Sequence, residues 1–220
     1  MKKNHPTWQR TALLYCSLNV SERMVAAMER IRVMLVEDDP FWKQQLSEDL
    51  QLESDIEFVC VADTKEAAVK AAQELEIDVI LMDINLTGNN LDGLQAAEMV
   101  NRLHTQCKVI MLTSMTEKEI ILKSFQVGAV NYITKSSYKD IIMAIRDAHT
   151  ERASIHADAA ELLRTEIQLM SLTPMEREVF ELRKEGLSKT QISDKLTKSV
   201  NTIKSQLRSM KNKLVFFKED

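Results

Sequence analysis

The sequence of 220 residues predicts an α/β domain built on a parallel β-sheet, followed by a small all-α domain. Between residues 31 and 149, short apolar runs alternate with amphipathic helical patterns, which implies parallel strands joined by right-handed helical crossovers. After Leu172, helix-start signals follow one another with no strand-like run between them. The low content of glycine (4) and proline (3) argues against a loop-rich all-β architecture.

Five apolar runs are expected to form the strands. The run 79–82 consists of four large apolar residues, which cannot alternate between core and water, so it predicts a strand buried on both faces. Five such strands in a segment of this length suit the flavodoxin-like order of a doubly wound sheet. The expected strands are residues 31–36, 56–61, 79–83, 108–112 and 131–133.

Helices are expected between the strands, because apolar residues recur there at three- and four-residue spacing. In the second of these segments, Ala68, Ala72 and Leu75 lie on one face that can cover the sheet. The expected helices are residues 41–52, 65–75, 93–103, 117–126 and 138–149.

The chain is expected to have four parts. Residues 31–150 form the α/β domain, and residues 171–220 form the all-α domain. Residues 151–170 are polar without a strong apolar stripe, so we expect a linker there, in which several alanines permit a helix. Residues 1–30 lie outside the alternation of strands and helices, and are either an N-terminal extension or the result of a mis-called translation start.

The net charge of −4 is unevenly distributed along the chain. Residues 171–220 carry 11 basic and 7 acidic side chains, a local net charge of +4, which leaves −8 for residues 1–170. An acidic domain joined to a basic one points to a polyanion as one partner. No apolar run approaches the ~18–20 residues that span a bilayer, and the three cysteines lack metal-ligand spacing and need no oxidising compartment. We therefore expect a cytoplasmic protein with no membrane partner.

Acidic side chains follow two of the predicted strands at the point where each strand ends. Glu37, Asp38 and Asp39 follow the first strand, and Asp83 ends the third. Because the carboxyl ends of parallel strands meet at one edge of a sheet, these carboxylates come together there, which is costly without a cation. Oxygen ligands suit Mg²⁺, which also binds phosphate. We interpret this edge as a metal site beside a phosphate-accepting aspartate; for Asp83 alone, a polar strand terminator is the simpler alternative.

A hydroxyl group and a cation are expected at the same edge. Thr113 follows the fourth strand, and Lys135 follows the fifth. A phosphoryl group on Asp83 needs cationic and hydroxyl partners, which Lys135, Mg²⁺ and Thr113 could supply. Taken alone, Lys135 would be a solvated loop lysine and Thr113 a strand-end cap, but their arrival beside the acids favours the functional interpretation.

The all-α domain has the pattern of a helix-turn-helix. Thr173 to Glu176 is a capping box with proline at the first helical position, and Ser188 to Gln191 is a second capping box. Ser199 could cap a third helix. Two short helices joined by a tight turn, with a basic outer face on the second, are typical of DNA-binding units.

Basic and polar side chains of this domain are the candidate DNA contacts. Lys204, Arg208 and Lys211 are spaced to lie on one face of the last helix. Side chains at the start of the preceding helix could reach phosphates, and small polar side chains of the last helix could read a base edge. A merely solvated basic face is the alternative. The candidates are Lys189, Thr190, Asn201, Lys204, Ser205, Arg208 and Lys211.

Residues 31–150 resemble the receiver domain of a bacterial two-component response regulator. The resemblance implies that Asp83 is the phosphoacceptor. It also implies that Glu37, Asp38, Asp83 and the backbone carbonyl of Asn85 serve Mg²⁺. The motifs that carry it are residues 36–40, 81–86, 111–114 and 128–135.

The same resemblance assigns the residues that respond to the phosphate. Thr113 would be the switch hydroxyl that turns towards the phosphate, and Tyr132 the aromatic residue that changes rotamer with it. Lys135 would be the cation that bridges to the phosphate. In this chain Ser136 follows Lys135 where the family frequently has proline, so a cis peptide bond is not expected there.

Residues 171–217 resemble the LuxR-type helix-turn-helix of the NarL/FixJ class of response regulators. Residues 172–179 and 186–192 follow the pattern of that unit closely, and residues 202–204 match its recognition helix. The chain departs from the pattern at Lys198, where an apolar residue is usual, and at Gln206, where histidine is common.

The two resemblances together imply a transcription regulator whose DNA binding is switched when a sensor histidine kinase phosphorylates Asp83 with Mg²⁺. The implied partners are promoter double-stranded DNA, the kinase and a second copy of the chain, in a homodimer formed on activation. The receiver would promote only its own phosphoryl transfer and dephosphorylation, so the chain is not expected to be an enzyme. An aspartyl-phosphate phosphatase is disfavoured, because it would carry its nucleophile in an Asp-x-Asp motif after the first strand. A constitutive DNA binder with an unphosphorylated, protein-interacting receiver stays open.

Overall fold

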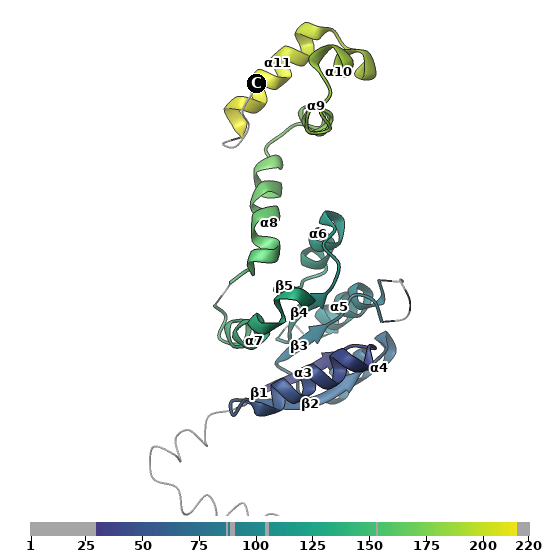
Figure 1. Ribbon diagram of the computed structural model, residues 1–220, viewed down its shortest axis with the longest axis vertical. Helices are drawn as coiled ribbons and strands as arrows, with labels where there is room; N and C mark the ends of the chain where they lie inside the picture. The colour runs from purple at the N-terminus through teal and green to yellow at the C-terminus, as the bar shows by residue number, and fades with distance from the viewer. Residues whose placement is uncertain (1–29, 87, 89–90, 104–105, 153, 215–220) are drawn as a thin grey trace, which may run out of the picture. The chain divides into compact units, whose positions relative to one another are not determined.

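The computed structural model describes residues 30–86, 88, 91–103, 106–152 and 154–214 (Figure 1). These residues form two compact units, of which the first ends at His156 and the second begins at Ala157. The predicted N-terminal extension, residues 1–30, lies outside the described residues except for Arg30.

The first unit is built on a five-stranded parallel sheet in the order β2-β1-β3-β4-β5, which confirms the predicted flavodoxin-like fold. Strand β3 is central, and its four side chains are fully buried, as expected for a strand covered on both faces. In β1, Leu35 packs in one core cluster, while the equally buried Met34 points to the opposite face. The strands are β1 (Ile31–Val36), β2 (Ile56–Ala62), β3 (Val79–Met82), β4 (Lys108–Thr113) and β5 (Asn131–Thr134).

Helices cover both faces of this sheet. Helices α3 (Pro40–Leu52) and α7 (Ile141–His149) share one core cluster with side chains from all five strands, so they lie on the same face. The described residues of α4 (Lys65–Glu74), α5 (Asp92–Leu103) and α6 (Lys118–Gln126) do not belong to that cluster, and these helices cover the opposite face. The result is the three-layer α/β sandwich expected for strands that alternate with helices.

The segment after β5 differs from the prediction of one helix over residues 138–149. A 3₁₀ helix, η1 (Lys135–Asp140), comes first, and the α-helix begins only at Ile141. The hydroxyl groups of Thr134 and Ser136 hydrogen-bond to each other at the start of this segment, with their oxygens 2.7 Å apart. The tight turn keeps Lys135 at the carboxyl edge of the sheet.

The second unit consists of helices around a small apolar core, as predicted for the all-α domain. Helix α8 (Ala157–Leu169) occupies most of the residues predicted as a linker. Helices α9 (Pro174–Lys184) and α10 (Lys189–Leu196) each begin with a complete capping box, and Ser199 caps α11 (Val200–Lys213). The most deeply buried core residues are Val179, Ile192, Ile203, Leu207 and Met210.

Gly93, in the first turn of α5, lies against the backbone that carries Asp83. Its amide donates a hydrogen bond to the carbonyl oxygen of Ile84 at 2.9 Å. A β-carbon added at Gly93 would lie 1.8 Å from the carbonyl oxygen of Asp83. Rotation of a side chain cannot relieve a clash with backbone, so the site requires glycine here.

Replacing Gly93 with alanine is expected to lower the free energy of unfolding by about 3 kcal/mol or more, because α5 or the loop after β3 must move. Gly88→Ala is the matched control, since nothing lies within 4 Å of the added carbon and only the strain of a φ of 65° remains. That strain costs about 1–2 kcal/mol. Denaturant titration of both variants measures the difference, and equal losses would contradict the constraint at Gly93.

Candidate functional site

Three carboxylates meet at the carboxyl edge of the sheet. Each of Glu37, Asp38 and Asp83 offers a carboxylate oxygen, and these oxygens lie within 4.8 Å of one another. The parallel pairing of Val36 with Met82 brings the ends of β1 and β3 side by side, so the carboxylates that follow the two strands lie close together. It is the single such group of potential metal ligands among the described residues.

Lys135 bridges two of these carboxylates. Its Nζ lies 2.6 Å from Glu37 Oε2 and 2.8 Å from Asp83 Oδ2. Only 7% of Lys135, 1% of Glu37 and 7% of Asp83 is exposed, so solvent screens this charge cluster weakly. One ammonium group therefore offsets part of the repulsion between two buried carboxylates.

Burial and charge shift the pKa values in this cluster. Burial raises the pKa of Glu37 above its ordinary value and the charge of Asp83 adds to the rise, although the hydrogen bond from Lys135 opposes it. Burial lowers the pKa of Lys135, but its hydrogen bonds to Asp83 and Glu37 outweigh this and leave the pKa raised. The ammonium group of Lys135 consequently stays charged at neutral pH.

The predicted switch residues are connected through Met115, in the loop after β4. Thr113 Oγ1 accepts a hydrogen bond from the amide of Met115 at 3.4 Å. Tyr132 is fully buried, and its hydroxyl donates to the carbonyl oxygen of Met115 at 2.6 Å. The side chain of Asn85 also reaches this loop, with Nδ2 3.5 Å from Met115 Sδ. Sequence reasoning missed Met115, because no residue type marks a loop whose backbone supplies the contacts.

The third acid of the first loop has a different environment. Asp39 is the N-cap of α3, and its Oδ1 accepts hydrogen bonds from the amides of Phe41 at 2.8 Å and Trp42 at 3.1 Å. An aspartate directly before a proline at the first helical position is a helix-start signal that could have identified this cap. Trp42 lies close to Lys135, with Nζ 5.5 Å from the ring centroid.

In the second unit, five of the seven predicted DNA-contacting side chains share the outer face of α11, and the other two lie on α10. The inner face of α11 carries the buried residues Ile203, Leu207 and Met210, which pack in the core. The outer face is the side opposite to them. Lys189 and Thr190 lie at the start of α10, where Lys189 is partly exposed and Thr190 is exposed. The exposed candidates on α11 are Asn201, Lys204, Ser205, Arg208 and Lys211.

A buried carboxylate joins α9 to the far end of α11. Glu176 is 2% exposed, accepts a hydrogen bond from the amide of Thr173 at 2.7 Å and pairs with Lys213 Nζ at 2.6 Å. Burial alone would raise the pKa of Glu176, but hydrogen bonds from Lys213, Ser209 and Thr173 lower it to about 2. The ion pair fixes α11 against α9, so it orients the basic face.

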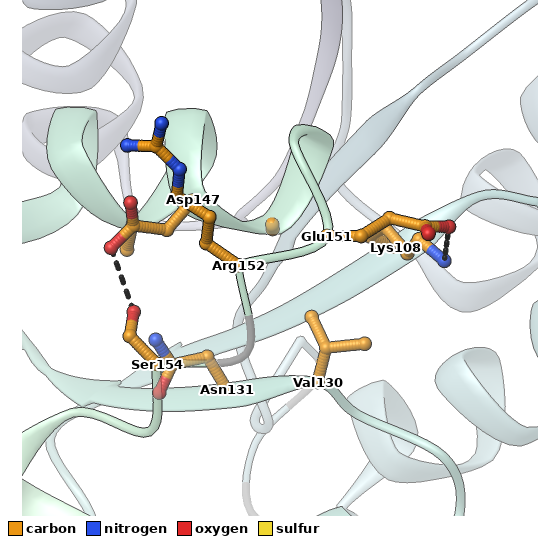
Figure 2. Close-up of a pocket in the computed structure, with 9 residues that line it drawn as sticks. Lys108, Val130, Asn131, Asp147, Glu151, Arg152 and Ser154 are labelled. Carbon is orange, nitrogen blue, oxygen red and sulfur yellow. Dashed lines mark hydrogen bonds and ion pairs between the residues drawn. The ribbon is translucent and has the colours of Figure 1, made fainter.

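A cavity of about 200 Å³ lies at the opposite edge of the sheet, where β4 and β5 begin (Figure 2). The loop after α7 forms its rim. Ser154 donates a hydrogen bond to Asp147 at 2.7 Å, and Lys108 pairs with Glu151 at 3.6 Å. Both contacts are drawn as dashed lines in Figure 2. The cavity is therefore separate from the acidic edge that holds Asp83.

A parallel α/β unit with an acidic carboxyl edge, followed by a helix-turn-helix with a basic face, defines a modular DNA-binding regulator. The model of the response regulator receiver domain matches residues 33–146, and that of bacterial regulatory proteins of the luxR family matches residues 170–216. The chain belongs to the response regulators with a receiver domain and a LuxR-type helix-turn-helix, the NarL/FixJ type.

Curated relatives of the same architecture cover most of the chain. Response regulator UvrY of Escherichia coli (strain K12) is 30% identical over 193 residues, which cover 84% of this chain and 88% of UvrY. Transcriptional regulatory protein LiaR of Bacillus subtilis (strain 168) is 29% identical over 193 residues, with coverage of 84% and 90%.

Solved structures share the fold. A structure of the RcsB response regulator of Salmonella typhimurium matches with a TM-score of 0.60 at 22% identity, and covers 87% of this chain and 95% of RcsB. The response regulator domain of Thermotoga maritima CheB matches with a TM-score of 0.51 at 30% identity, and covers 56% and 98%. Within the described residues, no helix is both long enough and apolar enough to cross a membrane.

Glu176→Gln is expected to lower the free energy of unfolding of the second unit by about 1–3 kcal/mol at pH 7, because Lys213 loses a charged partner. Since the pKa of Glu176 is lowered from 4.5 to about 2, its contribution is complete above pH 4.5 and is lost as the pH falls towards 2. The difference between wild type and variant should therefore shrink at pH 3.

Glu178→Gln is the matched control, because Glu178 is exposed on the same helix and its replacement is expected to change stability by less than about 0.5 kcal/mol. Denaturant titrations of the full chain followed by circular dichroism measure both variants at both pH values. Equal effects at positions 176 and 178 would contradict the role of the Glu176–Lys213 pair.

Proposed function

We propose that this response regulator is a transcription regulator whose DNA binding is switched when a sensor histidine kinase phosphorylates Asp83. The observation that carries the proposal is the carboxylate of Asp83, held 2.8 Å from Lys135 Nζ at an edge that also presents Glu37 and Asp38. A carboxylate beside a buried cation and a candidate metal site is equipped to accept a phosphoryl group. In this proposal the receiver comprises residues 31–150, the linker 151–170 and the DNA-binding domain 171–220.

The residues at this edge fit Mg²⁺. The three clustered side chains offer only carboxylate oxygens, which are the hard ligands that Mg²⁺ prefers, and two of them are buried with one lysine between them. Glu37, Asp38, Asp83 and the backbone carbonyl of Asn85 would hold the ion. When bound, Mg²⁺ supplies positive charge that neutralises phosphoryl oxygens.

In the transfer, a carboxylate oxygen of Asp83 forms a bond to phosphorus while the bond from phosphorus to the histidine nitrogen of the kinase breaks. The histidine leaves as the neutral imidazole after its ring gains a proton from solvent, and Asp83 becomes an acyl phosphate. Lys135 stays beside Asp83 and pairs with the phosphoryl oxygens. The chain promotes this transfer, and the later hydrolysis, on itself alone, so it is not an enzyme with a separate substrate.

The response to phosphorylation runs through Thr113 and Tyr132, which both contact the backbone of Met115. If Thr113 turns its hydroxyl to the phosphate, it releases the amide of Met115, and the loop that also binds Tyr132 can move. A phosphate that interacts better with one arrangement of this loop shifts the population towards it. We propose that the favoured arrangement forms a homodimer in the cytoplasm.

The basic face of α11 binds promoter double-stranded DNA in this proposal. Lys204, Arg208 and Lys211 are exposed on one side of the helix and suit phosphate contacts, and Asn201 and Ser205 are short enough to read base edges. Lys189 and Thr190 lie at the N-terminus of α10, where backbone amides favour phosphate. A related structure is described as two RcsB dimers bound to two parallel DNAs, which supports a dimeric DNA binder.

Mg²⁺-dependent labelling by acetyl phosphate tests the phosphoacceptor. We expect wild type to gain the mass of one phosphoryl group and Asp83→Asn to gain none. Asp39→Asn is the control, because Asp39 caps α3 and lies outside the metal-ligand group, and it should still be labelled. No label on wild type would overturn the phosphoswitch and leave a constitutive DNA binder whose receiver is an interaction module.

Arg208→Ala is expected to weaken binding to all DNA sequences and to reduce the slope of log affinity against log salt concentration by about 1, since one phosphate contact is lost. Lys184→Ala is the control, because it removes an exposed positive charge at the end of α9, outside the set of candidate DNA contacts. Fluorescence anisotropy with duplex DNA at several salt concentrations measures both. An unchanged slope for Arg208→Ala would exclude this face as the DNA contact.

A further inference from the structure

We propose that Trp42 is a positioning residue for Lys135, and that its indole ring holds the ammonium group beside Asp83 during phosphoryl transfer. The inference rests on the proposed function and adds a residue outside the acid, hydroxyl and lysine set. Lys135 Nζ lies over the Trp42 ring, 5.5 Å from its centroid, which is within the range of a cation–π interaction.

The ring of Trp42 is fixed from three directions. Its amide donates to the Asp39 cap at 3.1 Å, which anchors the first turn of α3. Phe41 packs edge-on with ring centroids 5.4 Å apart, and Tyr138 of η1 packs edge-on at 5.9 Å. A ring held by its backbone and by two aromatic neighbours keeps its orientation without help from Lys135.

Trp42 can attract the ammonium group of Lys135 without competing with the two carboxylates for its N–H donors. An ammonium group has three N–H donors, and two directions are taken by Glu37 at 2.6 Å and Asp83 at 2.8 Å. The face of an indole attracts the remaining positive charge without accepting a directed hydrogen bond. Because Lys135 is only 7% exposed, little water is available to replace that attraction.

The contact with Trp42 becomes most important when Glu37 is occupied elsewhere. Glu37 is both the shorter ion-pair partner of Lys135 and a candidate metal ligand, so its carboxylate would attract the lysine less while it held a divalent cation. Lys135 then depends on Asp83 and Trp42 for its position. Asp83 is the group that reacts, which leaves Trp42 as the partner of Lys135 that does not change during the transfer.

Core packing is the competing explanation for Trp42, because the side chain also packs against the cluster beneath α3 and α7. The two roles predict different patterns of substitution. A packing role is served about equally by leucine and phenylalanine, whereas a cation–π role is kept in part by phenylalanine and lost with leucine. Only the cation–π role couples Trp42 to the charge of Lys135.

A double-mutant cycle on stability, without Mg²⁺, combines Trp42→Leu with Lys135→Met in the full chain. We expect the two changes to be coupled by about threefold to tenfold in the unfolding equilibrium constant, with weaker coupling for Trp42→Phe. Phe125→Leu is the matched control, since it removes a partly buried aromatic ring of α6, on the opposite face of the sheet from Trp42, and should show no coupling to Lys135.

The same variants are then labelled with acetyl phosphate and Mg²⁺. The labelling rate should fall about threefold to tenfold in Trp42→Leu and less in Trp42→Phe, and stay unchanged in Phe125→Leu. Additive effects in the cycle, or equal labelling rates for Trp42→Leu and wild type, would overturn the role of Trp42. A wild-type chain that takes no label would instead overturn the proposed function, and the cycle would still report on the contact.

Discussion

The repulsion between buried carboxylates at one edge of the sheet is the constraint on which the first unit depends. Glu37 and Asp83 are almost completely buried, and the ammonium group of Lys135 lies between them. Like charges in so little solvent are unfavourable unless a cation is held with them. The parallel order of the strands brings these three residues together from β1, β3 and β5, and Gly93 allows the backbone of α5 to approach Asp83 closely. The carboxyl edge carries more negative than positive charge, and this excess of negative charge attracts a divalent cation.

The second unit also contains a buried carboxylate, but its charge is fully compensated by neighbouring donors. Glu176 has hydrogen bonds from the backbone of Thr173 and from Lys213, so its charge is satisfied within the protein. Its pKa is accordingly lowered, whereas that of Glu37 is raised. The comparison separates a structural carboxylate, which is fully paired, from one whose charge is left partly uncompensated for a ligand. The paired carboxylate holds α11 against α9, and the other belongs to the candidate reaction site.

The order of strands and helices could be predicted from the sequence, because buried apolar runs identify strands. The clustering of the acidic side chains could be predicted as well, because parallel strands end at a common edge of the sheet. The sequence did not predict the 3₁₀ segment that begins at Lys135, because residue spacing alone does not distinguish a short 3₁₀ helix from the first turns of an α-helix. Contacts between side chains that lie far apart in the chain could not be predicted from the sequence either. The ring of Trp42 over Lys135 depends on side-chain orientation, and the contacts of Thr113 and Tyr132 with Met115 involve a loop backbone. These contacts join segments far apart in the chain, and no local pattern records them.

The carboxyl edge of the sheet is proposed to bind a divalent cation beside Asp83. Calorimetric titration of Mg²⁺ into wild type, Asp38→Asn and Asp39→Asn tests it most directly, because Asp38 belongs to the metal-ligand group and Asp39 is the cap of α3. We expect one Mg²⁺ per wild-type chain, at least about tenfold weaker binding to Asp38→Asn and unchanged binding to Asp39→Asn. Wild type that binds no Mg²⁺, or equal affinities for all three chains, would contradict the claim.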